Sequence, residues 1–126
     1  MNKEELRRRF AGYSRHGKKF EKALETVASG GVKGHRFVPS GRVIYTVVGH
    51  LGDEFVDPDR HYCSCSNYYF RVLTGREDTC YHLLSYEMAA EAKAVEIADF
   101  GDEEYDAMLS VITRDVFDVI DRSAGG

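Results

Sequence analysis

Cys63-Ser64-Cys65 and, after fourteen intervening residues, Cys80-Tyr81-His82 contain every cysteine of this 126-residue chain. The pattern supplies three thiolates and one imidazole. Four such side chains complete a tetrahedral ligand set for Zn²⁺ and leave no position for a water molecule. The sequence therefore predicts a closed, structural zinc site formed by Cys63, Cys65, Cys80 and His82.

Two other uses of the cysteines explain less of the pattern. In a disulfide framework three thiols would leave one unpaired, and Cys63 and Cys65 are spaced too closely for an unstrained disulfide. A catalytic thiol beside an imidazole is the second alternative, and Cys80 with His82 offers that pair. The pair accounts for only two of the four residues, so we favour zinc and keep an enzyme built on Cys80 and His82 as the weaker hypothesis.

Periodicity around the four residues predicts a hairpin followed by a helix. Residues 43–48 are β-branched or aromatic throughout, which favours a buried strand. A further strand begins at residues 61–65, and because side chains alternate along a strand, Cys63 and Cys65 are expected on the same face. Thr79 is a suitable N-cap, which places Cys80 and His82 in the first turn of a helix, where the helix dipole favours a thiolate.

The whole chain is predicted to be an α+β protein, with a small antiparallel sheet and a zinc-clamped ββα finger between helices. We expect short helices at 4–10 and 18–29, a strand at 32–38, a long helix at 79–98 and a second long helix after Gly101. Together with the hairpin before the cysteines, we expect about three antiparallel strands. We divide the chain into a basic helical arm (1–31), a zinc finger with strands and helix (32–98) and an acidic C-terminal helix (99–126), together one compact domain.

Charge is distributed unevenly along the chain. Residues 1–42 carry 11 Lys and Arg against 4 Glu, whereas residues 43–126 carry 6 against 17 Asp and Glu. Either the basic segment folds onto the acidic body, or it faces an anionic partner such as nucleic acid. The overall pI of about 5.7 slightly favours the internal pairing.

Two segments contain candidate contacts to nucleic acid. These are Arg7, Arg8, Arg9, Lys18 and Lys19 in the basic segment, and Tyr68, Arg71 and Arg76 in the loop at 66–79. An aromatic ring can stack on a base while arginines hold phosphates, as in single-strand binders. A solvated helix face is the simpler explanation of the basic run, and packing around the metal is the simpler explanation of the aromatic residues.

The four ligands and their surroundings resemble a SWIM zinc finger. Residues 40–48 resemble its first strand, residues 62–70 its second strand and exit, and residues 79–84 its last two ligands at the start of a helix. The resemblance covers about half of the chain, from about Gly41 to Ala90. Tyr81 stands where many members have Lys, which leaves the ligands unchanged but removes a cation that could face nucleic acid.

The resemblance implies a role in binding rather than catalysis. Small stand-alone prokaryotic and archaeal SWIM proteins are similar to the partners of RecA-family recombinase paralogs in homologous recombination, which implies a zinc-dependent adaptor with a protein partner. SWIM modules of transposases and chromatin remodellers imply the alternative, direct binding of single- or double-stranded DNA.

The last predicted helix carries an apolar stripe: Tyr105, Met108, Leu109, Ile112, Val116, Val119 and Ile120. Val111 and Phe117 lie off this stripe. They indicate either a surface for a partner or a homodimer, or a broader buried face.

Hydropathy gives no sign of a membrane protein. No stretch approaches the ~18–20 consecutive apolar residues that cross a bilayer, and a charged segment follows Met1. We therefore expect no membrane contact and a cytoplasmic location, in a reducing compartment that suits thiolate ligands.

Overall fold

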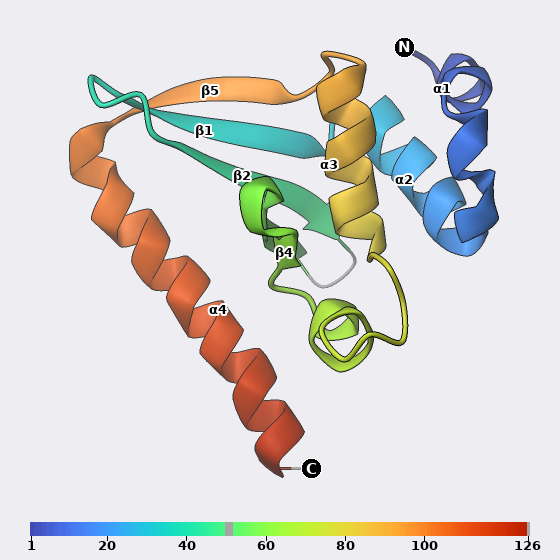
Figure 1. The fold of residues 1–126 in the computed structure, drawn as a ribbon. Helices are drawn as coiled ribbons and strands as arrows, with labels where there is room; N and C mark the ends of the chain where they lie inside the picture. Colours follow the sequence, from blue (N-terminus) through green and yellow to red (C-terminus); the bar gives the residue numbers. More distant parts are fainter. Residues whose placement is uncertain (50–51, 126) are drawn as a thin grey trace.

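A five-stranded sheet organises the computed structural model, which describes residues 1–49 and 52–125 (Figure 1). The strands are β1 (Val32–Val38), β2 (Val43–Gly49), β3 (Gly52–Asp57), β4 (Tyr62–Cys63) and β5 (Glu96–Gly101). They lie in the order β4-β3-β2-β1-β5, and each neighbouring pair is antiparallel except β1 with β5, which is parallel. Helices accompany this sheet, so the predicted α+β class is confirmed.

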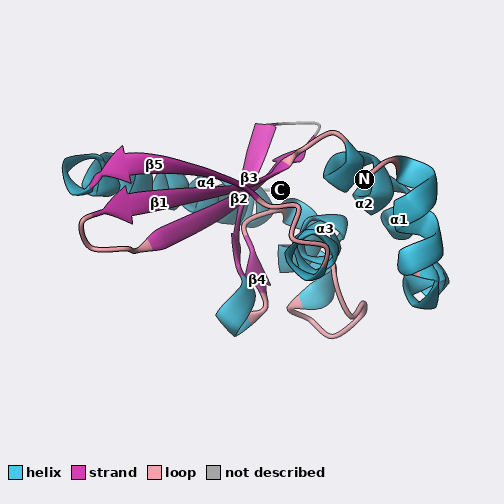
Figure 2. Ribbon diagram, turned by 90° about the horizontal axis from the view of Figure 1, so that it is seen from above, coloured by secondary structure: helices cyan, strands magenta, loops and turns pink. Residues whose placement is uncertain are grey.

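Two helices precede the sheet, as the sequence predicts. α1 (Lys3–Arg9) begins at Asn2, whose side-chain oxygen accepts a hydrogen bond from the Glu5 N–H at 2.9 Å. A 3₁₀ turn at Ala11–His16 leads into α2 (Lys18–Ala28), which packs against α3 (Tyr81–Glu91). Figure 2 shows α1 and α2 at the end of the sheet opposite the turn between β1 and β2.

The prediction of a long helix at 79–98 is wrong for the second half of that segment. α3 ends at Glu91, Lys93 adopts a left-handed φ of 57°, and the Ala94 N–H donates to Ala89 O at 2.8 Å. Residues 96–101 instead form β5, which pairs with β1 from Lys33 opposite Glu96 to Val38 opposite Gly101. Pairing with a distant strand therefore overrides the helix propensity of this Ala- and Glu-rich segment.

The sheet is also larger than the expected three antiparallel strands. Residues 52–57 form β3, a full strand around Phe55 and Val56, for which the sequence pattern indicates only a short strand piece or a loop. In contrast, the strand expected to begin at His61 and to carry both cysteines is only the two residues of β4, so Cys65 lies beyond it. Short helical turns at Pro58–Arg60, Tyr68–Val72 and Asp102–Glu104 fill the connections.

Apolar residues pack on both faces of the sheet. On one face, Tyr45 of β2 contacts Tyr86 of α3 at 4.8 Å between ring centroids. The largest cluster lies between this face, α2 and α3, and it includes the three cysteines. On the other face Phe37 is fully buried and meets the ring of Tyr105 edge-on at 5.1 Å. The sheet is therefore a central layer.

The second long C-terminal helix, α4 (Tyr105–Gly125), runs from the end of β5 across this second face (Figure 1). Its stripe residues Met108 and Ile112 are half-buried there, whereas the side chains of Val119 and Ile120 lie outside the described part. Within the described ranges, no helix combines the length and apolar character needed to cross a membrane.

Phe37→Ala tests how much the packing of Phe37 against Tyr105 of α4 stabilises the fold. Because the Phe37 side chain is 0% exposed, its removal should lower the free energy of unfolding by about 3–5 kcal/mol, measured by chemical denaturation in the presence of zinc. Phe70→Ala is the matched control, since Phe70 is 47% exposed, and it should cost less than about 1 kcal/mol. Equal losses would contradict this view of the core.

Candidate metal centre

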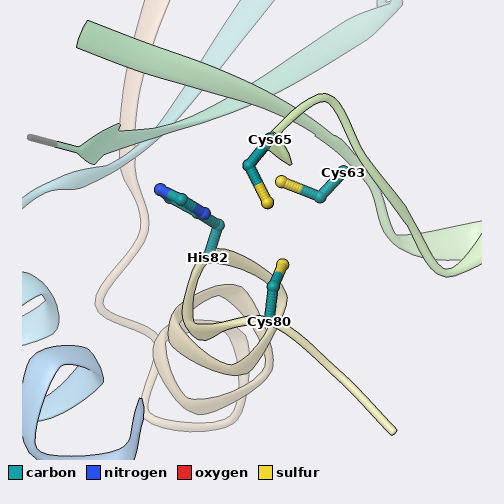
Figure 3. A group of neighbouring side chains, drawn as sticks. All are labelled: Cys63, Cys65, Cys80 and His82. Atoms are coloured by element: carbon teal, nitrogen blue, oxygen red, sulfur yellow. The ribbon is translucent and has the colours of Figure 1, made fainter. Parts of the chain in front are cut away.

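Four side chains from two parts of the fold converge at the start of α3. One ligand atom from each of Cys63, Cys65, Cys80 and His82 lies within 4.8 Å of the other three. Figure 3 shows the three sulfur atoms pointing toward one another, with the His82 ring beside them. All four residues are buried. The structure thus brings together the whole predicted ligand set.

The surroundings of His82 fit a metal ion. Its Nδ1 atom is buried and has no hydrogen-bond partner among the described residues. A buried ring nitrogen without a partner is costly, and coordination to a metal satisfies it. Three sulfurs and one nitrogen are the donor set of structural zinc sites, so the cluster can hold a metal ion and its chemistry is that of zinc.

The start of α3 favours a thiolate at Cys80. Hydrogen bonds from the thiols of Cys63 and Cys65, and from the backbone N–H groups of Leu83 and His82, lower the pKa of Cys80 to about 4. The pKa of Cys63 is raised, because its thiol is hydrogen-bonded to Cys65 and Cys80 and is buried. These hydrogen bonds therefore favour Cys80 as the sulfur that binds a metal as a thiolate.

Cys80, rather than the predicted Thr79, is the N-cap residue of α3. The buried Thr79 hydroxyl donates to Cys80 O at 3.3 Å and so does not cap the helix. The placement is shifted by one residue, and Cys80 and His82 still lie at the positive end of the helix.

Ser64 fixes the Cys-x-Cys turn on the sheet, a role that the sequence analysis missed. Its N–H donates to Phe55 O, and its hydroxyl accepts from the Phe55 N–H, both at 2.9 Å. The same hydroxyl donates to Glu54 Oε2 at 2.7 Å. These bonds continue the pairing with β3 past β4, and they position the cysteines on either side. The sequence signal that could have indicated this role is a small hydroxyl residue between the two cysteines.

Contacts outside the cluster anchor its other segments. The Lys19 ammonium donates to Thr79 O at 2.6 Å and pairs with Glu77, which ties α2 to the segment leading into α3. The Tyr68 N–H donates to Cys65 Sγ at 3.3 Å. His61, the other histidine near the cysteines, lies 3.0 Å from Asp78 O through Nε2 and takes no part in the cluster.

The residues predicted to contact nucleic acid are spread over several elements. Arg7 pairs with Glu21, and Lys19 and Arg71 both face Glu77. Arg9 donates to Glu91 O at 2.9 Å. Arg8, Lys18 and Arg76 are exposed. The half-buried Tyr68 packs edge-on against Tyr62, as expected for a residue around the metal. Lys18 and Lys19 line a hollow beside the metal cluster, together with Cys65 and His82.

Comparison with known proteins adds no relative. No protein-family model, curated protein or solved structure matches the chain. The SWIM resemblance therefore rests on the motif residues themselves.

Cys63→Ser tests the ligand set. We expect about one zinc ion per chain in the unchanged protein and loss of tight zinc binding in the variant, because a hydroxyl is a poor zinc ligand. Elemental analysis of protein purified without chelators measures this, and the thermal midpoint should fall with the metal. Full zinc content in the variant would show that the ligands are assigned wrongly.

Gly49→Ala tests the packing around His82 without removing a ligand. A methyl group at this position would lie 2.8 Å from His82 Nε2 and 3.1 Å from both Tyr81 Oη and Gly52 O. The imidazole must shift, so zinc affinity should fall about 10- to 100-fold, measured by chelator competition.

Gly12→Ala is the matched control for that experiment. A methyl group there meets no atom within 4 Å, so zinc affinity should not change. Unchanged affinity in Gly49→Ala as well would show that His82 is not held by this contact or is not a ligand.

Proposed function

We propose that this chain is a SWIM-like zinc finger protein that acts as an adaptor: zinc stabilises the fold, and the chain binds another protein without catalysing a reaction. The observation that carries the proposal is the burial of the complete donor set, with Cys63, Cys65, Cys80 and His82 only 1%, 5%, 0% and 6% exposed. A zinc ion with four protein ligands has no open position for a substrate. The metal would then stabilise the fold, and the surface of the protein would bind the partner.

The same burial argues against an enzyme based on Cys80 and His82. A nucleophilic thiolate needs partial exposure to reach its substrate, whereas Cys80 is 0% exposed. Its hydrogen bonds from Cys63 and Cys65 direct the sulfur into the cluster. We therefore keep the non-catalytic role as part of the proposal.

The surface of α4 is the part of the fold that best suits a protein partner. Phe117 is 58% exposed and Val111 is 53% exposed, although both are large apolar residues. Phe117 borders a shallow hollow on the outer side of the helix with Leu109 and Thr113. An exposed aromatic residue on a helix is a typical anchor for a groove on a partner.

The class of partner comes from the SWIM resemblance. It points to a RecA-family recombinase paralog in DNA recombination or repair, and α4 would supply the contact. A homodimer through the same helix is the competing use of this surface. Light scattering on the purified chain distinguishes the two, because a homodimer has twice the monomer mass in the absence of any partner.

Direct binding of single- or double-stranded DNA is the alternative function, and fewer contacts support it. Arg7, Lys19 and Arg71 have carboxylate partners within the chain, which supports the internal use of the basic charges. Arg8, Lys18 and Arg76 remain exposed and are available to phosphates. Direct binding by these residues would weaken steeply as salt is raised.

Phe117→Asp tests the adaptor proposal. Binding of the zinc-loaded chain to a purified RecA-family paralog from the same cell should weaken at least about tenfold, because a charge would replace an apolar anchor. Calorimetric titration measures the affinity, and Phe70→Asp is the control, since Phe70 is 47% exposed and belongs to the turn at Tyr68–Val72 rather than to α4.

Two results would count against the adaptor. The first is that the paralog binds Phe117→Asp and Phe70→Asp with equal affinity, or binds neither the variants nor the unchanged chain. The other is salt-sensitive binding of the isolated chain to DNA that is lost in Arg8→Ala with Arg76→Ala, which would favour the alternative.

A further inference from the structure

A hollow of about 310 Å³ lies beside the metal cluster. α2 forms one wall with Lys18, Lys19 and Lys22, and the opposite side comes from the residues after Cys65 and from the start of α3. Figure 1 shows α2 next to α3, so segments far apart in the sequence meet here. The metal site proper is the neighbouring cluster of three cysteines and His82. Neither that site nor the proposed partner surface on α4 explains why three lysines surround this hollow.

Two of these lysines have no acidic partner. Lys18 and Lys22 are one helical turn apart and both are exposed. Among the described residues, no carboxylate lies within ion-pair distance of either ammonium group. The Lys22 ammonium lies 5.3 Å from the centre of the Tyr81 ring, which holds it over the hollow. Unpaired cations that line a concavity attract an anion.

The third lysine and the acidic residue of the hollow are already engaged. Lys19 pairs with Glu77 and donates to Thr79 O. Its charge also offsets the single negative charge that three thiolates and Zn²⁺ leave on the metal centre. Glu54 lines the hollow too, but its Oε2 accepts the Ser64 hydroxyl at 2.7 Å. Lys18 and Lys22 are therefore the charges available to a ligand.

Asn67 adds a hydrogen-bond donor to the lining of the hollow. Its Oδ1 atom is buried and has no hydrogen-bond partner among the described residues. Because Oδ1 is the buried end of the amide, the NH₂ group is the end that can donate to an anion in the hollow. Ser66, exposed beside it, offers a hydroxyl.

We propose that this hollow is a phosphate-binding site, in which the ammonium groups of Lys18 and Lys22 hold the anion and Ser66 and Asn67 donate hydrogen bonds to it. Donors approach from two sides, α2 and the segment after Cys65, which suits a tetrahedral oxyanion better than a planar carboxylate. The phosphate group belongs either to a free phosphate or nucleotide, or to a nucleic-acid backbone. The site does not depend on the adaptor role of α4.

Titration of the zinc-loaded full chain with inorganic phosphate tests the site. Two-dimensional ¹H–¹⁵N NMR should show saturable shifts at residues 18–22 and 66–67, and acetate at equal ionic strength should give much weaker shifts. The double variant Lys18→Gln with Lys22→Gln should raise the dissociation constant at least about tenfold, because both charged contacts are lost.

A second double variant separates the site from overall charge. Lys33→Gln with Lys93→Gln removes the same charge from exposed positions that do not line the hollow, and phosphate binding should stay within about twofold of the unchanged chain. Elemental analysis should give full zinc content in all forms. Absence of saturable shifts, equal effects of the two double variants, or equal binding of acetate would overturn the proposal.

The source of the phosphate is read from two further titrations. If a twelve-nucleotide oligo-dT displaces inorganic phosphate at the same residues, the natural source is a nucleic-acid backbone. If AMP displaces the phosphate and the oligonucleotide does not, the source is a free nucleotide or free phosphate. Neither result involves Phe117, so failure of this site and failure of the adaptor proposal are distinguishable.

Discussion

Convergence of three thiols and one imidazole within 4.8 Å is the constraint on which the middle of this protein depends. The segment between β3 and α3 contains only the two residues of β4 and short helical turns, so it has few backbone ladders of its own. The same cysteines belong to the main apolar cluster, together with Leu84 and Phe20. Binding of a metal ion would therefore be coupled to core packing, because the residues that would hold the ion also lie in the apolar cluster that joins α3 to α2 and the sheet.

The ligand set could be predicted from sequence because its signal is local and chemical: the residue types and spacing name the donors without knowledge of the fold. β5 could not be predicted in this way. Its partner β1 is some sixty residues away, at Lys33 opposite Glu96, and the segment between Ala89 and Ala98 is rich in good helix formers. Ser64 was missed for a related reason, since its partner Phe55 is set by strand register rather than by sequence pattern.

α2 shows how one short helix can serve several purposes. Phe20, Ala23, Leu24 and Val27 place it in the core, and Lys19 reaches the segment before the metal ligands. Lys18 and Lys22 stay exposed on a neighbouring side. The uneven charge of the sequence thus has two outcomes in the structure: part of it pairs internally, as between Arg36 and Asp99, and part lies unpaired around a hollow.

β5 has a further consequence for the behaviour of the chain in a crowded solution. It is the last strand of the sheet in the part of the chain that the structure describes, so one side of its backbone has no strand beside it. Such an edge can template strand addition by another molecule, the first step of edge-to-edge aggregation. Glu96 is exposed on this strand, next to the exposed Ile97, whereas the carboxylate of Asp99 is paired with Arg36. The charge of Glu96 therefore opposes the addition of a like edge, because two copies would bring the same carboxylate together.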